Sequence, residues 1–423
     1  MEDVKEINLF PSGIIDMPPS KSAAHRAIIC ASLADGESVL KNISGSQDMT
    51  ATLRCMRGLG MRCLPETDMV TIHGGFPKAE ETLLDCGESG STLRFLIPLA
   101  SVLNGEISFT GQGRLMERPL TPYMDLLREK GVTMSFNEKT LTVKGPLRAG
   151  SFSLAGDVSS QFVSGLLFAL PLLAEDSRIE MVSPLQSAPY VDLTIDVMKH
   201  FGVTVEHDEY RKFFIAGGQC YQPQRFSVES DYSQAAFFLA AGALGCKCEC
   251  RGLSQTSKQG DKRILDLLRQ CGAKITTSAE GGLIVTAEKL SAVTVDVSDI
   301  PDLVPPLAVL FTFCEGTSRI VNAGRLRLKE SDRLSALTSE LNAIGADIFQ
   351  GEDSLTITGV KSLKGGKVKS WGDHRIAMAL AAAAIRSENP VLLEGSDCVS
   401  KSYPNFWNDF EKVPFEKMTA GGV

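Results

Sequence analysis

Hydrophobic and polar positions along this chain repeat in units of about seventy residues. In each unit an amphipathic helix ends at a glycine, and a short strand, a turn and a second strand follow. The glycines are spaced by 71, 71, 70 and 73 residues, and each suits the left-handed C-cap that turns a helix into a strand. They are Gly60, Gly131, Gly202, Gly272 and Gly345, and the second strands are predicted at residues 70–72, 141–143, 213–215, 283–285 and 355–357.

A second set of helix starts recurs with the same period. Its polar residues are spaced by 69, 69, 73, 69 and 71 residues, and each opens an apolar run. Helices this apolar are predicted to be core helices, buried on most sides. Their polar N-termini carry capping and anion-binding groups, and six equivalent N-termini could converge on one place. These starts are Ser22, Ser91, Ser160, Ser233, Asp302 and Asp373.

The sixth unit is incomplete at the end of the chain. A sixth helix is predicted over residues 404–412, where the next copy is due, and too few residues follow to complete that copy. An unmatched strand is predicted near the N-terminus, at residues 7–10, ending at Gly13. The pattern therefore predicts six βα-type units, the last of which is closed by the N-terminal strand.

Composition limits the class of protein. A chain of 423 residues is too long for one ordinary core, so two domains are expected. The net charge of −8 argues against broad binding to nucleic acid or to an anionic membrane. Residues 1–4 do not begin a signal peptide, and the longest apolar run, residues 376–385, is too short to span a bilayer. We expect a soluble cytoplasmic protein.

The eleven cysteines are mostly scattered, and their odd number favours reduced thiols. Cys246, Cys248 and Cys250 alternate as residues on one face of a strand do, which predicts three buried thiols. A metal site there would need a fourth ligand and chelating turns, and we predict no metal.

Candidate chemistry centres on residues 18–26. Two prolines lead into Ser20 and Ser22, which are good N-cap residues, and an Ala-rich helix follows. Lys21 and Arg26 then lie in the first turns, although cations normally avoid the N-terminus of a helix. This conflict predicts an anionic ligand, and the alternative is a solvated cationic pair near a cap.

Further segments supply cations, hydroxyls and amides at predicted helix starts and loops. Alone, each also has an ordinary interpretation as a cap, a solvated loop or a surface lattice of ion pairs. In the densest segment, residues 325–333, a helix would place Lys329 and Arg333 on one face with Glu330 beside them. The other segments are residues 87–94, 113–119, 156–161, 373–375 and 400–404.

In these motifs the chain resembles the 5-enolpyruvylshikimate-3-phosphate synthase (3-phosphoshikimate 1-carboxyvinyltransferase) family, from Lys21 to Lys401. The resemblance implies an α/β fold of two pseudo-symmetric domains, each with three βαβαββ repeats, in an inside-out α/β barrel. It places domain I at residues 1–18 plus 230–423, and domain II at residues 19–229. The motifs are Pro-Ser-Lys-Ser-x-x-x-Arg at 19–26, Gly-x-Ser-Gly-Ser-x-x-Arg at 87–94, Glu-Arg-Pro at 117–119, Ser-Ser-Gln-Phe at 159–162, Ser-x-Pro-Tyr at 187–190, Pro-Asp at 301–302, Leu-Lys-Glu-Ser-Asp-Arg at 328–333 and Asp-His-Arg at 373–375.

The resemblance also implies a reaction and a set of site residues. The enolpyruvyl group of phosphoenolpyruvate is transferred to the 5-hydroxyl of shikimate 3-phosphate, with release of phosphate and without a metal or organic cofactor. Asp302 is implied as the base, Glu330 as the acid, and Lys21 as a further catalytic residue. Shikimate 3-phosphate is assigned to Lys21, Ser22, Arg26, Ser159, Ser160, Gln161, Ser187, Tyr190, Asp302 and Lys329. Phosphoenolpyruvate is assigned to Lys21, Gly90, Arg118, Gln161, Arg333, Arg375 and Lys401.

This chain departs from the family pattern in two places, where Glu88 and Arg325 each replace a common Asn. Gly90, by contrast, is kept, which predicts sensitivity to glyphosate. Two alternative functions make different predictions for these motifs. The UDP-N-acetylglucosamine enolpyruvyl transferases have Lys-Asn in place of Lys21-Ser22 and a reactive Cys loop at residues 117–119. A non-catalytic anion-binding scaffold of the same repeats predicts loss of Asp302 or Glu330, and this chain has both. We expect small-molecule substrates, a monomer, and no nucleic-acid or membrane partner.

Overall fold

The computed structural model describes residues 4–137 and 139–412. The chain divides into two compact units. The terminal unit consists of the chain up to Pro18 together with the chain from Ser230 onward, and the central unit is Pro19–Glu229. We describe each unit by itself.

The central unit has three four-stranded sheets that share one strand order, β14-β3-β5-β4, β6-β7-β9-β8 and β10-β11-β13-β12. In each sheet the first pair of strands is parallel and the other two pairs are antiparallel. The strands are β3 (Gly36–Lys41), β4 (Arg62–Pro65), β5 (Met69–Gly74), β6 (Leu83–Asp85), β7 (Glu106–Thr110), β8 (Thr133–Asn137), β9 (Thr140–Lys144), β10 (Gly150–Leu154), β11 (Ser177–Met181), β12 (Glu206–Asp208), β13 (Lys212–Ile215) and β14 (Arg225–Ser227). The helices are α1 (Lys21–Leu33), α2 (Gln47–Gly58), α3 (Gly90–Ser101), α4 (Thr121–Glu129), α5 (Ser160–Ala169) and α6 (Ala188–His200), with 3-10 turns η1 (Leu115–Glu117) and η2 (Leu170–Leu172).

The terminal unit repeats this order in β2-β15-β17-β16 and β18-β19-β21-β20. Its third sheet, β22-β23-β1, has three strands and corresponds to the first three strands of that order. The strands are β1 (Val4–Ile7), β2 (Gly13–Asp16), β15 (Cys248–Arg251), β16 (Lys274–Thr277), β17 (Leu283–Thr286), β18 (Thr294–Asp296), β19 (Thr317–Val321), β20 (Asp347–Gln350), β21 (Leu355–Thr358), β22 (Gly366–Lys369) and β23 (Val391–Glu394). The helices are α7 (Tyr232–Ala243), α8 (Ile264–Gln270), α9 (Val304–Thr312), α10 (Arg333–Ala343), α11 (His374–Ala383) and α12 (Phe406–Phe410), with 3-10 turns η3 (Gly260–Arg263), η4 (Pro301–Leu303), η5 (Gly324–Leu328), η6 (Ala384–Arg386) and η7 (Ser396–Lys401).

The N-terminal strand closes the sixth sheet, as predicted. β1 runs antiparallel to β23, with Val4 opposite Glu394 and Ile7 opposite Val391, in the position that β21 holds in its own sheet. The predicted position of the strand, residues 7–10, was wrong by three residues. Pairing stops at Ile7 because Val391 begins β23 and the preceding Pro390 has no N–H to extend the ladder. The sequence reasoning also missed β2, which lies parallel to β15.

The five repeat glycines adopt the conformation that the sequence predicts. Their φ angles are +94°, +88°, +85°, +97° and +106° in chain order, a region that side chains with a Cβ rarely occupy. The chain then enters β4, β8, β12, β16 and β20, and each is followed by the predicted second strand, β5, β9, β13, β17 or β21. The five repeat boundaries are therefore confirmed.

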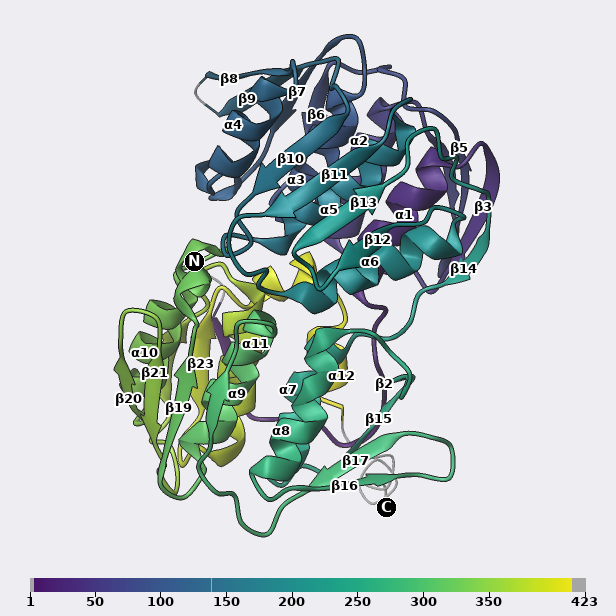
Figure 1. Ribbon diagram of the computed structural model, residues 1–423. Coiled ribbons are helices and arrows are strands. Elements are labelled where there is room, and N and C mark those ends of the chain that lie inside the picture. Colours follow the sequence, from purple (N-terminus) through teal and green to yellow (C-terminus); the bar gives the residue numbers. More distant parts are fainter. Residues whose placement is uncertain (1–3, 138, 413–423) are drawn as a thin grey trace. The chain divides into compact units, whose positions relative to one another are not determined.

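The apolar helices form the cores, and the sheets lie outside them (Figure 1). Every residue of α7, α9 and α11 is buried in the terminal unit, and α1, α3 and α5 are largely buried in the central unit. This arrangement confirms the inside-out α/β fold class. Five of the six predicted starts lie at the caps or in the first turns of these helices, whose side-chain caps include Ser20, Ser89, Ser159, Asp231 and Asp373. The sixth, Asp302, lies in η4, the 3-10 turn directly before α9.

Two segments carry the chain between the units, and each is anchored by a main-chain hydrogen bond. The amide of Ser20 donates to the carbonyl of Glu229 at 2.7 Å, and the amide of Asp231 donates to the carbonyl of Pro18 at 2.8 Å. The strands on either side are exchanged: β2 precedes α1 in the chain but pairs with β15, whereas β14 precedes α7 but pairs with β3. The starts of α1 and α7 are thereby fixed by strands from the far end of their own units.

The cysteine pattern is only partly as predicted. Cys248 and Cys250 are buried in β15, whereas Cys246 lies before the strand and is half-buried, because the strand begins two residues later than the alternation indicates. Among the described residues, no helix combines the length and apolar character needed to cross a membrane. Nor does any group of three or more His, Cys, Asp or Glu side chains in those ranges suit a metal ion.

Candidate functional site

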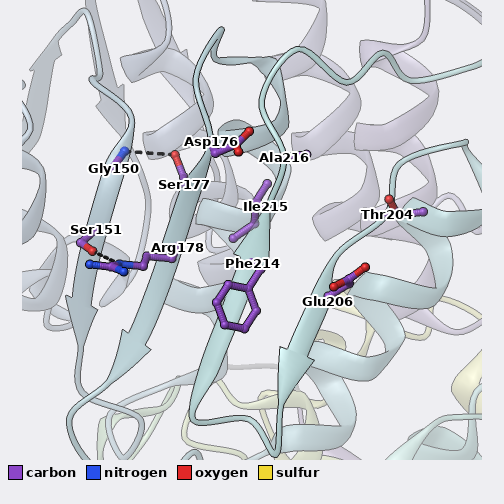
Figure 2. Close-up of a pocket in the computed structure, with 10 residues that line it drawn as sticks. All are labelled: Gly150, Ser151, Asp176, Ser177, Arg178, Thr204, Glu206, Phe214, Ile215 and Ala216. Atoms are coloured by element: carbon purple, nitrogen blue, oxygen red, sulfur yellow. Dashed lines mark hydrogen bonds between the residues drawn. The ribbon is translucent and has the colours of Figure 1, made fainter.

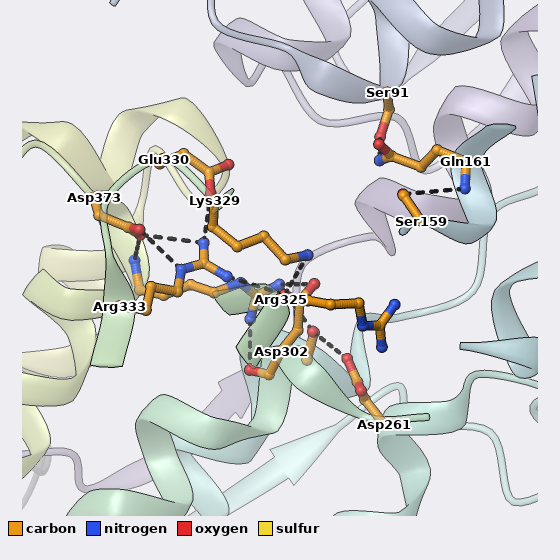
Figure 3. Close-up of polar contacts among 12 residues, drawn as sticks. Ser91, Ser159, Gln161, Asp261, Asp302, Arg325, Lys329, Glu330, Arg333 and Asp373 are labelled. Carbon is orange, nitrogen blue, oxygen red and sulfur yellow. Dashed lines mark hydrogen bonds and ion pairs between the residues drawn. The ribbon is translucent and has the colours of Figure 1, made fainter. Parts of the chain in front are cut away.

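In the terminal unit, charged side chains gather around Arg333, the first residue of α10 (Figure 3). Its Nη1 lies 3.0 Å from Asp302 Oδ1 and its Nη2 lies 2.8 Å from Glu330 Oε2. On the other side, Nε donates to Asp373 Oδ2 at 2.8 Å. Arg333 is 1% exposed, so these contacts form in a nearly dry environment. One guanidinium thus holds both predicted catalytic carboxylates, which come from η4 and from the turn before α10.

Asp302 is surrounded by cations. Besides Arg333, its carboxylate lies 3.5 Å from Lys329 Nζ and 3.2 Å from Arg375 Nη2. Burial opposes ionisation of Asp302, but the charges of Arg375, Lys329 and Arg333 outweigh it and hold its pKa well below the usual range. Burial in turn lowers the pKa of Lys329, although the Asp302 charge opposes that shift. Asp302 is therefore a carboxylate at neutral pH, and only 18% of its side chain is exposed.

Glu330 joins a second predicted residue to the cluster. Its Oε1 lies 3.7 Å from the Nζ of Lys401, a residue at the end of η7 that is 3% exposed. Ser331, the next residue, donates to Asp373 Oδ2 at 3.0 Å and fixes the turn before α10. Five predicted residues of this unit are therefore linked in one network of ion pairs, and Arg375 joins it through Asp302. They are Asp302, Lys329, Glu330, Arg333 and Lys401.

The segment 325–333 does not form the single helix that the shared-face argument required. Gly324–Leu328 is a 3-10 turn, Lys329 is extended, and α10 begins at Arg333 with Asp332 as its N-cap. Lys329 and Arg333 meet through Asp302 instead of through helical spacing. Arg325, one of the two departures from the family pattern, donates through Nη2 to the carbonyl of Ser298.

In the central unit, Lys21 is the first residue of α1 and its Nζ lies 2.8 Å from Asp48 Oδ2, in the first turn of α2. Asp48 is 5% exposed. The sequence reasoning did not find Asp48, because an acidic residue in a first helical turn is ordinary and nothing local points to Lys21. The predicted cation thus has a buried counter-ion 27 residues away.

Gln161 connects α5 to α3. Its Nε2 donates to Ser91 Oγ at 2.8 Å, and its Oε1 accepts from Arg94 Nη1 at 2.7 Å. A Cβ built on Gly90 lies 2.8 Å from Arg118 Nη1 and 3.3 Å from Arg94 Nη1, so both guanidinium groups reach the start of α3. Arg94 was recognised in its motif but was not among the predicted ligands.

Arg26 has a different environment from the one expected of an exposed anion ligand. It is 3% exposed and donates to the Ser22 carbonyl, the Tyr190 carbonyl and Thr194 Oγ1 at 2.6, 2.8 and 2.8 Å. Burial lowers its pKa to about 10. Arg26 therefore ties α1 to the start of α6, where Ser187 is the buried N-cap with φ +59°. Ser159 caps α5 and Ser160 begins it.

Three cavities among the described residues lie away from these charged clusters. One of about 550 Å³ opens on the sheet of β10–β13 and is lined by side chains such as Arg178, Glu206 and Phe214 (Figure 2). Two others in the terminal unit, of about 430 and 460 Å³, border Arg386 and Cys248 respectively. None of the three includes a predicted site residue, so the candidate residues are the charged cluster that each unit carries by itself.

Comparison with known proteins agrees with the motifs. The sequence profile of the family described as EPSP synthase (3-phosphoshikimate 1-carboxyvinyltransferase) matches residues 10–410. A relative from Clostridium perfringens is 45% identical over 417 residues, covering 97% of this chain and 98% of the relative. One from Clostridium kluyveri is 47% identical over 416 residues, covering 97% of each. Both are named 3-phosphoshikimate 1-carboxyvinyltransferase.

Solved structures show the same fold. An EPSP synthase from Acinetobacter baumannii has a TM-score of 0.79 at 27% identity and covers 97% of both chains. The enolpyruvyl transferase NikO from Streptomyces tendae has a TM-score of 0.76 at 16% identity, covering 96% of both chains. The second likeness concerns the fold alone.

Proposed function

The chain belongs to the EPSP synthase (3-phosphoshikimate 1-carboxyvinyltransferase) family, and on this premise we propose which residues carry its reaction. The enzyme transfers the enolpyruvyl group of phosphoenolpyruvate to the 5-hydroxyl of shikimate 3-phosphate and releases phosphate, a step of aromatic amino acid biosynthesis. Both substrates carry several negative charges, and guanidinium and ammonium groups suit such ligands.

One observation carries the assignment of the chemistry: Asp302 and Glu330 lie on the same guanidinium, at 3.0 and 2.8 Å (Figure 3). Addition to the enol double bond removes a proton from the 5-hydroxyl and adds one to the methylene carbon. Elimination then breaks the bond to phosphate and removes a proton from the new methyl group. We assign the hydroxyl proton to Asp302 and the carbon-bound proton to Glu330.

The low pKa of Asp302 is compatible with a role as base only if its cations change partners. Three cations stabilise this carboxylate in the structure and weaken it as a base. Anionic substrates compete for Arg375, Lys329 and Arg333, so their binding raises the pKa of Asp302 toward its ordinary value. The same ligands that bring the hydroxyl therefore activate its base.

The remaining roles follow the charges and hydroxyls of each unit. We assign shikimate 3-phosphate to Lys21, Ser22, Arg26, Ser159, Ser160, Gln161, Ser187 and Tyr190 of the central unit and to Asp302 and Lys329 of the terminal unit. We assign phosphoenolpyruvate to Lys21, Gly90, Arg118, Gln161, Arg333, Arg375 and Lys401. For Arg26, three of whose five N–H groups donate to protein oxygens, the assignment requires the phosphate to reach the other N–H groups or to replace one of these bonds. We further propose a cytoplasmic monomer.

Phosphate release measured with two different acceptors tests the identity of the acceptor. Two variants test the proposed proton-transfer roles of the carboxylates. With phosphoenolpyruvate present, shikimate 3-phosphate should release phosphate and UDP-N-acetylglucosamine should not. Asp302→Asn and Glu330→Gln keep the shape of each side chain and should each lower kcat by roughly 100-fold or more. Near-normal turnover in either variant would remove that residue from the proton transfers.

A further inference from the structure

A buried carboxylate outside the assigned roles is linked to the site through a hydroxyl. Asp261, in η3, is 3% exposed, and its Oδ2 accepts a hydrogen bond from Ser233 Oγ (Figure 3). Ser233 Oγ in turn accepts from Arg375 Nη2 at 2.9 Å. The same Nη2 lies 3.2 Å from Asp302 Oδ2. A continuous chain of contacts thus runs from Asp261 through Ser233 and Arg375 to Asp302.

We propose that Asp261 is a positioning residue that holds Arg375, through the hydroxyl of Ser233, in the orientation that binds phosphoenolpyruvate. A serine hydroxyl has one hydrogen to donate, and Asp261 takes it. The oxygen lone pairs of Ser233 are then left to accept from Arg375, which fixes the direction of Nη2. An outer carboxylate acting through a hydrogen-bonded group is a common way to orient a ligand-binding side chain.

The position of Asp261 is itself fixed by its neighbour Gln259. Gln259 Oε1 accepts from the amide of Tyr232 at 3.0 Å, and its Nε2 donates to the carbonyl of Ser230 at 2.8 Å. These two bonds attach the segment before η3 to the first turn of α7, which carries Ser233. The carboxylate therefore faces Ser233 from a rigid support.

Ionisation of Asp261 makes the link testable by pH. Burial, together with the charges of Asp302 and Asp231, raises its pKa to about 6, against the opposing effects of Arg375 and the Ser233 hydroxyl. The folded-state pKa is above the ordinary value, so Asp261 is charged above about pH 6 and neutral below it. A neutral Asp261 attracts the Ser233–Arg375 pair less strongly, and Asp261→Asn mimics this state at every pH.

The experiment measures kcat and the KM for phosphoenolpyruvate between pH 5 and pH 8 in the full chain. At pH 8, Asp261→Asn and Ser233→Ala should each raise KM roughly tenfold, with a smaller change in kcat. The ratio of wild-type to Asp261→Asn kcat/KM should fall toward one as pH falls through 6, because only the wild type loses a charge. This ratio cancels the titration of substrate phosphates. The double variant should be no worse than either single variant.

Asp266→Asn is the matched control, since Asp266 is exposed in α8 and pairs with Arg269 at 2.9 Å. It should leave KM unchanged. A ratio that is constant across pH, or additive effects of the two substitutions, would overturn the proposal. If Asp261→Asn fails to fold, an unchanged KM in Ser233→Ala overturns it equally. The inference rests on the assignment of Arg375 to phosphoenolpyruvate. An unchanged KM in Arg375→Lys contradicts that assignment. A KM that is raised in Arg375→Lys but unchanged in Asp261→Asn and Ser233→Ala contradicts only the role of Asp261.

Discussion

Arg333 and Asp373 form a buried, two-point ion pair. Nε lies 2.8 Å from Oδ2 and Nη2 lies 3.2 Å from Oδ1, with exposed fractions of 1% and 0%. Asp373 also caps α11 by accepting from the amide of Arg375 at 3.0 Å. The pair therefore joins the start of α10 to the start of α11, and it fixes the plane of the guanidinium that holds Asp302 and Glu330.

Asp373→Asn should destabilise the terminal unit by about 3 kcal/mol, because it leaves Arg333 with a buried charge that has lost its main counter-ion. An Asn keeps the helix cap, so capping is not the cause of the loss. Asp332→Asn is a matched control: Asp332 also caps a helix and pairs with an arginine, Arg327, at 2.9 Å, but both side chains are 30% exposed. Its loss should stay below about 1 kcal/mol. Denaturant unfolding measures both, and equal losses would contradict the argument.

Binding and chemistry should separate in Asp302→Ala. Turnover should fall by about 1000-fold, since the proposed base is removed. Binding of shikimate 3-phosphate should persist, because Lys329 loses an anionic neighbour and the ligand keeps its other contacts. Calorimetry measures the affinity, and Asp296→Asn, an exposed carboxylate that accepts from Asn322 at 2.7 Å, serves as control. Complete loss of binding would show that Asp302 is needed to bind the ligand and would contradict a role mainly in proton transfer.

Gly90→Ala should weaken inhibition by glyphosate at least tenfold while changing the KM for phosphoenolpyruvate less. A Cβ at Gly90 lies 2.8 Å from Arg118 Nη1, so the methyl group displaces that guanidinium. Glyphosate is longer than phosphoenolpyruvate, so it leaves less room for the displaced guanidinium. Gly45→Ala, where a Cβ meets nothing within 4 Å, is the control. Steady-state inhibition at varied phosphoenolpyruvate decides the matter, and equal losses for both ligands would count against it.

Stability should depend on His25 at mildly acidic pH. Burial lowers its pKa from 6.5 to about 3, with smaller opposing and reinforcing effects of Asp48, Lys21 and Arg26. Between pH 6.5 and about pH 3 the imidazole of His25 is protonated in the unfolded chain but not in the folded one. The stability that neutral His25 contributes is therefore lost as pH falls below about 6.5. From pH 6.5 to pH 5.0 the expected loss is about 1.5–2 kcal/mol. His25→Asn removes the titrating group but keeps a polar side chain that can hydrogen-bond to Thr52. Between pH 6.5 and pH 5.0 the free energy of unfolding of this variant should fall by about 1.5–2 kcal/mol less than that of the wild type. Parallel plots of unfolding free energy against pH would contradict the role of His25.

Much of the fold could be predicted because it depends on local signals. Gly60 and its four counterparts end helices through a backbone conformation that glycine adopts readily, and this marks the repeat without any knowledge of contacts. The apolar helices can likewise be predicted to lie in the core, because they are apolar on most sides. The end of β1 could not be predicted, because Ile7 stops the strand only through its pairing with Val391 at the far end of the chain.

The sequence by itself determined the six repeats, the buried helices, the family and the types of residue that carry the chemistry, since helix caps, periodicity and motifs are all read over a few residues. Only the tertiary structure decided which charges meet. Lys21 pairs with Asp48, Arg333 with Asp373, and Asp261 reaches Arg375 through Ser233, across separations of 27 residues or more. Ion pairs between different helices depend on how those helices pack. Packing in turn depends on many weak contacts summed over a whole core, so no single segment of sequence determines it.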